Sequence, residues 1–312
     1  MPELIFHHYP NSPFSEKVRL IFGFKKLAWT SVLIPVIMPK PDVVALTGGY
    51  RRTPILQIGA DIYCDTALIC DVLEQHAPTP TLYPPAQAGL ARTLAQWADS
   101  TLFSTAIGYA FQPAGMQSMF GNLPPEHAKA FGADRAAMRG NAARMAPGEA
   151  TANLTTYLDR LENMLGAGQP YLLGDAATIF DFSVYHAIWY VRRVQSLSGI
   201  LERAPNLLAW ADRMAACGHH DSKQRSSAEA IEIARSSTPA AAAADAVFVD
   251  VHGIALGATV TITPTDYALD PVVGTLVEAS AERIAIVRSD PRAGEVVVHF
   301  PRIGFALKAV AG

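Results

Sequence analysis

The sequence predicts an α/β domain, then an all-helical domain, and finally a small all-β, barrel-like domain. Three observations predict this order: strand and helix signals alternate over residues 1–83, strand signals are nearly absent over 87–217, and residues 247–312 are rich in Val, Ile and Thr between turn residues. A chain of 312 residues is long enough for two or three such domains. Hydrophobic residues make up 50% and charged residues 17%, which excludes a disordered chain.

The first domain is expected to have the order β-α-β-loop-β-β-α. Residues 4–8 and 29–35 are typical of buried strands, and an amphipathic helix lies between them. Residues 54–64 predict a hairpin that turns at 59–61. Apolar residues at helical spacing then predict a helix over 66–75.

The second domain, residues 87–217, is expected to be a helical bundle. Ala- and Leu-rich stretches predict helices over 87–111, 125–145, 149–166, 179–194 and 205–216. One helix start is well marked, because Thr178 and Asp181 form a capping box between Ala177 and Phe182. In such a box the two side chains satisfy backbone N–H groups that the helix leaves free.

The last third of the chain begins with a linker over 218–246 that carries one helix. Ser226 and Glu229 form a second capping box, and this helix should run to about Ser236. Residues 247–312 then predict strands of six to nine residues separated by Asp-Pro and Gly turns. This pattern is typical of a small β-barrel or a rolled sheet.

Several function classes are excluded at this stage. No run of 18 apolar residues is present, so no membrane span is expected, and the N-terminus lacks the pattern of a signal peptide. Cys64, Cys70 and Cys217 form neither a CxxC motif nor a metal-ligand spacing. We therefore expect no structural metal and a reducing, cytoplasmic location. A net charge of −3 argues against a general nucleic-acid binder.

The first strand-to-helix turn, Tyr9 to Ser15, is a candidate site. Pro13 suits the first position of a helix, so Ser12 becomes the N-cap. Ser12 could serve only as a cap, a role worth about 1 kcal/mol. Alternatively, the helix N-terminus and the Ser12 hydroxyl could stabilise a thiolate and lower its pKa.

Two further turns carry polar residues in positions that suit a ligand. Thr53-Pro54 stands just before a strand, where an X–Pro bond can be cis. Asp65 and Thr66 open a helix directly after a strand. They could simply cap that helix, or Asp65 could bind an ammonium group while Thr66 and the helix N–H groups bind a carboxylate.

Taken together, these motifs make residues 1–217 resemble a glutathione transferase. Ser-Pro-Phe-Ser followed by Glu-Lys-Val-Arg is similar to the active-site turn of the serine-type classes, Thr53-Pro54 to the cis-proline loop, and the Thr178/Asp181 box to the capping motif of the helical domain. The resemblance implies a thioredoxin-like first domain and a helical second domain. Residues 247–312 resemble an appended domain of some bacterial relatives.

The resemblance also implies roles for individual residues. Ser12 would be catalytic and hold the glutathione thiolate. The implied glutathione-binding set is Ser12, Phe14, Arg52, Thr53, Pro54, Asp65 and Thr66. Arg52, with Arg51 or Lys40 as other candidates, would bind the glycine carboxylate, unless the two arginines are simply solvated. Thr53 replaces the usual aliphatic residue, and Asp65-Thr66 replaces the usual Glu-Ser.

A second, electrophilic substrate is expected between the first two domains. Candidates for this pocket are Tyr9, Phe103, Tyr109 and Met116, which could also be core residues of the bundle. The leading hypothesis is a homodimeric enzyme that uses glutathione as co-substrate and no metal. The alternative is a non-catalytic protein that binds glutathione or uses its C-terminal β-domain to bind a protein. Ser12 and Ser15 stand where a redox relative has cysteines, which disfavours disulfide exchange.

Overall fold

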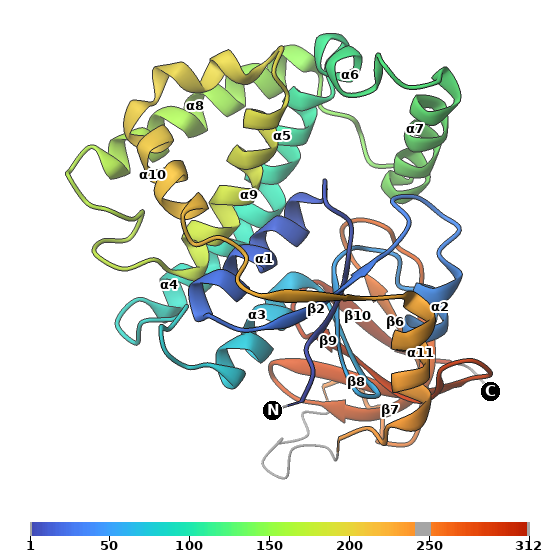
Figure 1. The fold of residues 1–312 in the computed structure, drawn as a ribbon. Coiled ribbons are helices and arrows are strands. Elements are labelled where there is room, and N and C mark those ends of the chain that lie inside the picture. The colour runs from blue at the N-terminus through green and yellow to red at the C-terminus, as the bar shows by residue number, and fades with distance from the viewer. Residues whose placement is uncertain (1, 241–250, 311–312) are drawn as a thin grey trace.

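The computed structural model describes residues 2–240 and 251–310. An α/β part lies beside a helical part, and the C-terminal strands lie next to the α/β part (Figure 1). None of the described helices combines the length and apolarity needed to cross a bilayer. The elements follow the predicted succession of an α/β region, a helical region and a β-rich region, so this prediction is confirmed.

The α/β part has the thioredoxin-like order that the sequence predicts, with one addition. Its elements are β1 (Ile5–His8), α1 (Pro13–Lys25), β2 (Trp29–Leu33), α2 (Pro41–Thr47), β3 (Ile55–Ile58), β4 (Asp61–Cys64) and α3 (Thr66–His76). Strand β1 pairs in parallel with β2 and antiparallel with β3, which forms the predicted hairpin with β4. Helix α2 is the addition, in a segment that the sequence analysis left as a loop.

The helical part packs around the central helix α9 (Ile179–Arg193). The other elements are α4 (Ala88–Trp97), a π-helical turn (Ala98–Leu102), α5 (Phe103–Ala110), α6 (Pro113–Phe120), α7 (Pro125–Arg139), α8 (Pro147–Leu165), a 3-10 turn (Ser198–Arg203) and α10 (Pro205–Ala215). The predicted capping box is confirmed at the start of α9, where the Asp181 carboxylate accepts from the Thr178 N–H at 2.9 Å. The same buried carboxylate accepts from Leu172 N and Trp210 Nε1, which ties three elements together.

The C-terminal strands do not form a sheet of their own. They are β6 (Thr259–Pro264), β7 (Val272–Ala279), β8 (Arg283–Asp290), β9 (Gly294–Pro301) and β10 (Phe305–Ala309). Strand β9 pairs in parallel with β4, so the order of the continuous sheet is β10-β6-β7-β8-β9-β4-β3-β1-β2-β5. The strands are where the sequence predicts them, but the expected separate barrel is instead an extension of the thioredoxin-like sheet.

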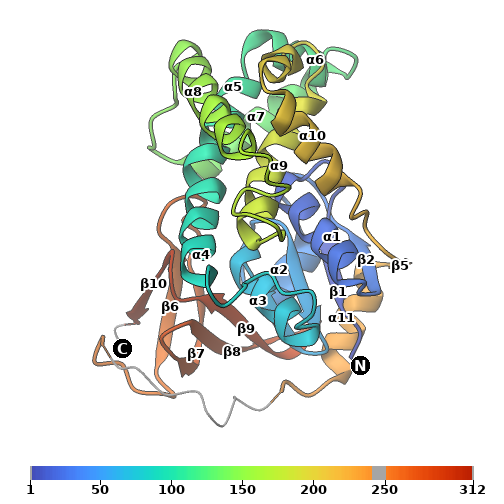
Figure 2. The same ribbon diagram turned by 90° about the vertical axis from the view of Figure 1, so that its left-hand side faces the viewer.

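The linker also joins this sheet. Strand β5 (Ser222–Arg225), which the sequence analysis missed, pairs in parallel with β2. Helix α11 (Ser227–Ser236) follows, with the predicted Ser226/Glu229 capping box and the predicted end. Helices α11 and α2 and the C-terminal strands share a second hydrophobic core, distinct from the core between α1, α3 and the helical part (Figure 2).

The junction between β4 and β9 contains a side-chain hydrogen bond and a ring stack in addition to apolar packing. His299 Nε2 lies 2.8 Å from Asp61 Oδ1, and the His299 ring stacks on Tyr63 at 4.6 Å between ring centres. Both partners of this hydrogen bond are buried. These contacts dock the C-terminal strands on the hairpin of the α/β part.

Candidate functional site

The turn that carries Ser12 has the predicted geometry. Ser12 has an extended backbone, and its Oγ accepts from Ser15 N at 3.1 Å at the start of α1. Its N–H donates to Tyr9 O at 3.2 Å, which closes the turn. The N-cap prediction is confirmed. The Ser12 side chain is buried, with the residue 1% exposed.

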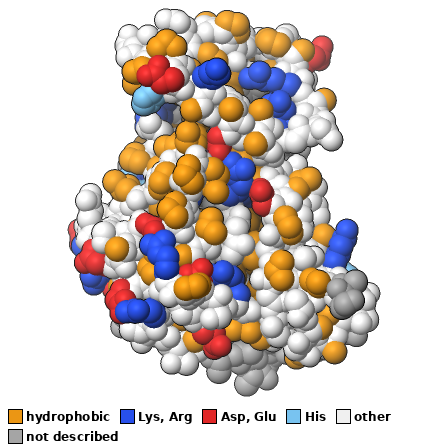
Figure 3. All heavy atoms as spheres, turned by 90° about the vertical axis from the view of Figure 1, so that its right-hand side faces the viewer, with side chains coloured by type: hydrophobic (Ala, Val, Ile, Leu, Met, Phe, Trp, Pro, Cys, Tyr) orange, Lys and Arg blue, Asp and Glu red, His pale blue; other side chains and the backbone are white. Residues whose placement is uncertain are grey.

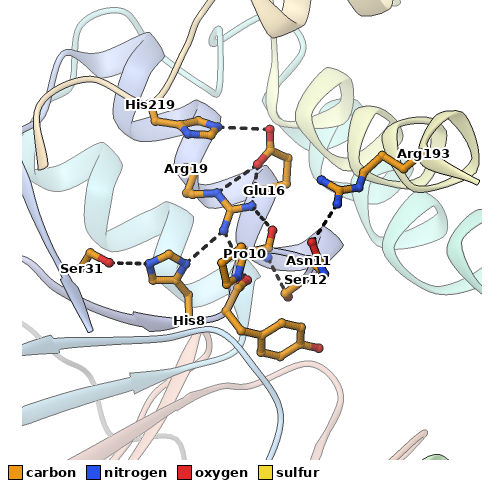
Figure 4. A network of polar contacts seen from close by, with 11 residues as sticks. His8, Pro10, Asn11, Ser12, Glu16, Arg19, Ser31, Arg193 and His219 are labelled. Carbon is orange, nitrogen blue, oxygen red and sulfur yellow. Dashed lines mark hydrogen bonds and ion pairs between the residues drawn. The ribbon is translucent and has the colours of Figure 1, made fainter. Parts of the chain in front are cut away.

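Arg19 holds this turn in place from one side (Figure 4). Its guanidinium donates to Pro10 O at 2.9 Å and to Tyr9 O at 3.4 Å, and it pairs with Glu16 at 2.6 Å. The same group lies 3.0 Å from His8 Nδ1. Burial, together with the positive charge of Arg19, lowers the pKa of His8 to about 3. His8 is therefore neutral, and its Nδ1 accepts from Arg19.

A groove of about 380 Å³ lies on the outer side of this network. It is lined by Arg19, Trp29, Trp189 and His219, among others, and Glu16 in its wall is 3.1 Å from His219 Nε2. None of the residues predicted to bind glutathione lines it. The groove therefore belongs to the support behind the Ser12 turn rather than to the predicted site.

Lys40 lies beside the second predicted turn. The Thr53–Pro54 peptide bond is cis, as predicted. Lys40 Nζ donates to Thr53 Oγ1 at 3.1 Å and to Arg51 O at 3.5 Å. The residue is 3% exposed, and among the described residues no carboxylate forms an ion pair with it. Burial lowers the pKa of Lys40 to about 8, so a buried cation adjoins Thr53 without a counter-charge in contact.

The third turn combines anionic and cationic groups. Asp65 caps α3 by accepting from Ala67 N at 2.9 Å, as predicted, and burial raises the pKa of its carboxyl group. Lys17 Nζ lies 3.4 Å from Thr66 Oγ1 and 2.6 Å from Asp99 Oδ2. Burial disfavours the charge of Lys17, but the neighbouring groups, Asp99 foremost, together outweigh burial and raise the pKa of the ammonium group. An ammonium and two carboxylates therefore surround Thr66.

The sequence analysis missed Lys17 and Asp99. Lys17 lies four residues after Pro13, hence on the same face of α1 as the start of the helix. That spacing could have identified Lys17 as a candidate site residue from the sequence. Asp99 lies far away in the sequence, in a π-helical turn, and only the fold brings it to α1. Such turns often occur at functional sites.

Arg51 and Arg52 have protein partners of their own. Arg51 pairs with Asp134 of α7 at 2.5 Å. Arg52 pairs with Asp266 at 2.6 Å and donates to the carbonyl oxygen of Tyr267, in the loop between β6 and β7. The side of the molecule that carries α7 and α2 in Figure 1 faces the viewer in Figure 3, where acidic and basic side chains are interspersed among hydrophobic ones. Both arginines therefore connect the Thr53-Pro54 turn to other parts of the fold.

The four residues expected to line a second pocket do not share one environment. Phe103 packs on Phe14, with ring centres 4.6 Å apart. Tyr9 lies near Ser12, and its phenol is 3.5 Å from a nitrogen of Arg135. Tyr109 is buried and donates to Leu197 O at 2.9 Å, inside the bundle. Met116 lies on α6, half-buried.

Further side chains gather near Tyr9. Phe111 packs against Phe131 and Tyr190 at 5.9 and 6.2 Å, and the Arg135 guanidinium lies 4.7 Å above the Phe131 ring. They come from three helices, so periodicity within any one helix could not reveal the cluster. Among the described residues, no group of three or more metal-ligating side chains could hold a metal ion.

The structure combines a thioredoxin-like sheet, capped helix starts at Ser12 and Asp65, a cis-proline between them and a helical second part. This combination defines a class of glutathione-dependent proteins. Comparison with known proteins agrees. Residues 6–81 match the glutathione S-transferase N-terminal domain, and residues 133–213 match the C-terminal domain of the same family. A GST-like protein from Pseudomonas syringae is 42% identical, with a TM-score of 0.82, over 99% of this chain and 100% of that one. The chain belongs to the glutathione S-transferase family.

More distant structures cover a smaller share of this chain. A glutathione S-transferase from Rhodospirillum rubrum is 19% identical with a TM-score of 0.51, and covers 68% of this chain and 88% of its own. A Tau class enzyme from mango is 16% identical with a TM-score of 0.52, over 69% and 89%. No curated protein matches the chain. The Pseudomonas protein, by contrast, extends over the C-terminal strands as well.

Proposed function

We propose that the chain binds glutathione and stabilises its thiolate with Ser12 for attack on a small electrophile. The observation that carries the proposal is a pair of buried lysines, each beside a hydroxyl group expected to contact glutathione. Lys40 adjoins Thr53, and Lys17 adjoins Thr66. Glutathione has two carboxylates, one at each end, and each lysine would bind one of them.

The two ends of the tripeptide would have different partners. The glycine carboxylate would bind Lys40, which has no carboxylate in contact among the described residues. Arg51 and Arg52, the other candidates for this role, already pair with Asp134 and Asp266. At the γ-glutamyl end, Lys17 and Thr66 would bind the carboxylate, and Asp65 with Asp99 would bind the ammonium group.

The chemistry follows from the position of Ser12. Its Oγ accepts from Ser15 N, so its O–H hydrogen can point toward a sulfur. That hydrogen bond and the helix N-terminus favour the thiolate over the thiol, and each unit of pKa lowering is worth about 1.4 kcal/mol. The thiolate would form a C–S bond to the electrophile, the leaving group would depart with the bonding electrons, and the thiol proton would pass to solvent.

A calorimetric titration of glutathione tests the proposal. We expect a Kd between micromolar and low millimolar for the wild type. Ser12→Ala should keep most of the affinity and lose at least tenfold in kcat for conjugation. Ser226→Ala is the matched control, because Ser226 also caps a helix through its Oγ but lies outside the site. No binding at about 10 mM, a free energy weaker than about −3 kcal/mol, would refute the proposal.

A second candidate function is glutathione binding without catalysis, with the C-terminal β-region as a protein-binding element. The burial of Ser12 favours it, since a buried hydroxyl can act as a helix cap alone. Binding without turnover on a broad panel of electrophiles would support this alternative. We also propose that the protein is a cytoplasmic homodimer, as is usual for the family. Light scattering that gives a stable monomer would refute the dimer.

A further inference from the structure

The loop between β6 and β7 connects the C-terminal region to both other parts of the molecule. Arg52 pairs with Asp266 and donates to the carbonyl oxygen of Tyr267. The next residue, Ala268, donates its N–H to Met138 O in α7 at 2.7 Å. Ala268 has a φ of 48°, a left-handed conformation that residues with a Cβ adopt at a cost. The contacts on both sides therefore hold this loop in a defined shape.

The Tyr267 side chain lies beside Arg52, near the charged groups around Tyr9. The Arg52 guanidinium lies 5.9 Å from the centre of its ring. Burial raises the pKa of the Tyr267 phenol, and the charges of Arg135, Asp134 and Tyr9 also act on it. The phenol is therefore neutral, able to donate a hydrogen bond, and close to the same groups that surround Tyr9.

This region carries more positive than negative charge. The Asp134 carboxylate is shared, because it pairs with Arg51 at 2.5 Å and with Arg135 at 3.0 Å. One carboxylate cannot neutralise two guanidinium groups. The charge of Arg135 also contributes to the low pKa of Lys40. If Lys40 binds the glycine carboxylate, as proposed above, one guanidinium charge remains without a counter-charge.

An aromatic surface lies beside this charge. The Arg135 guanidinium stacks over Phe131, which packs on Phe111, and Phe111 packs on Tyr190. Tyr9 is close enough to Tyr190 to affect the pKa of its phenol. The Arg135 guanidinium therefore borders this aromatic cluster on its Phe131 side.

We propose that Arg135 and Tyr267 determine substrate specificity, and that the electrophiles best suited to this enzyme are aromatic compounds that carry a carboxylate. The ring would pack on Phe111 and Tyr190. The carboxylate would accept from the Arg135 guanidinium and the Tyr267 hydroxyl. The C-terminal β-region would thus supply one residue of the substrate site. The inference rests on the proposed glutathione function.

The test compares two glutathione conjugates that differ by one carboxylate: S-(2,6-dinitrophenyl)glutathione and S-(4-carboxy-2,6-dinitrophenyl)glutathione. Their Kd values are measured by calorimetry for the full-length wild type, Arg135→Gln, Arg135→Lys and Tyr267→Phe. The matched control is Leu269→Ala, an exposed position in the same loop. The same proteins are assayed for conjugation with 1-chloro-2,4-dinitrobenzene and 4-chloro-3,5-dinitrobenzoate, to compare KM with kcat.

We expect the wild type to bind the carboxylated conjugate at least tenfold more tightly than the other. Arg135→Gln should remove this preference, Arg135→Lys should keep part of it, and Tyr267→Phe should reduce it severalfold. The effect in the assay should fall on KM for the benzoate. Leu269→Ala should match the wild type.

Equal affinity of the wild type for both conjugates, with normal glutathione binding, would overturn this inference alone. A preference that survives in both Arg135→Gln and Tyr267→Phe would overturn it as well. If neither glutathione nor either conjugate binds, the proposed function itself fails, and the inference fails with it.

Discussion

Replacing Lys40 by Met should stabilise the folded protein while it weakens glutathione binding. Burial lowers the pKa of Lys40 from 10.5 to about 8, so the unfolded chain holds this proton more strongly than the folded one. The penalty on the folded state is complete below pH 8, and it disappears as the pH rises toward 10.5. A shift of this size corresponds to about 3 kcal/mol at pH 7, at about 1.4 kcal/mol per unit.

Lost hydrogen bonds offset part of the gain in the free energy of unfolding that Lys40→Met should bring. Lys40 Nζ donates to Thr53 Oγ1 and Arg51 O, and losing such hydrogen bonds costs about 1 kcal/mol. The apolar stem is kept by Met, so packing changes little. The free energy of unfolding should therefore rise by about 1–3 kcal/mol at pH 7. The gain should shrink by about 2 kcal/mol at pH 10, where the wild-type lysine is neutral in the fold.

Urea unfolding at both pH values measures the effect, with Lys25→Met as the matched control. Lys25 is also buried, but it pairs with Glu74 at 2.6 Å and donates to two backbone carbonyls. Its replacement leaves a partly buried carboxylate without its partner and should cost at least about 2 kcal/mol. The explanation is wrong if Lys40→Met is less stable than the wild type at pH 7, or if its gain is the same at pH 10.

Further predictions concern the pH dependence and the supports of the site. The affinity for S-methylglutathione, which lacks a free thiol, should fall as the pH rises through 8, because only the protonated Lys40 attracts the carboxylate; calorimetry should show that Lys40→Met loses this step. Arg19→Gln should lower kcat more than it changes the Kd of glutathione, because Arg19 holds Tyr9 O and Pro10 O; an unchanged kcat would contradict this positioning role. Lys17→Met should destabilise the fold by about 2 kcal/mol, since the partly buried Asp99 carboxylate keeps His186 but loses its ammonium partner; thermal unfolding measures this. His299→Leu should cost about 1–3 kcal/mol by leaving Asp61 Oδ1 without its hydrogen bond, and a variant as stable as the wild type would argue against this contact.

The sequence could predict those features that depend on neighbouring residues. Capping boxes, the Ser12 cap and the 54–64 hairpin each involve residues a few positions apart, and all are confirmed. The strands of residues 247–312 were predictable for the same reason, since alternation is visible within one strand. Helix α2, with only seven residues and two valines, has too little periodicity to be distinguished from a loop.

Apart from the hairpin of β3 and β4, strand partners were not predictable, because alternation indicates which face of a strand is buried but not which edge it pairs with. The β4–β9 and β2–β5 pairings join residues far apart in the chain. The charges of the candidate site were missed for a related reason. Asp134, Asp266 and Asp99 are ordinary acidic residues in the sequence, and only the fold shows which cation each one holds.

The pairing of β9 with β4 bears on how the C-terminal region relates to the site. Without this region, β4 would be an edge strand with unpaired N–H and C=O groups, a surface that proteins normally protect. Here that edge is covered by the chain itself, so any dimer must form through another surface. The same region contacts Arg52, one residue before Thr53. The loop that contacts Arg52 joins β6 and β7, two strands of the sheet extension. A substitution that destabilises these strands should therefore change the conformation of the Thr53 turn as well as the stability of the sheet.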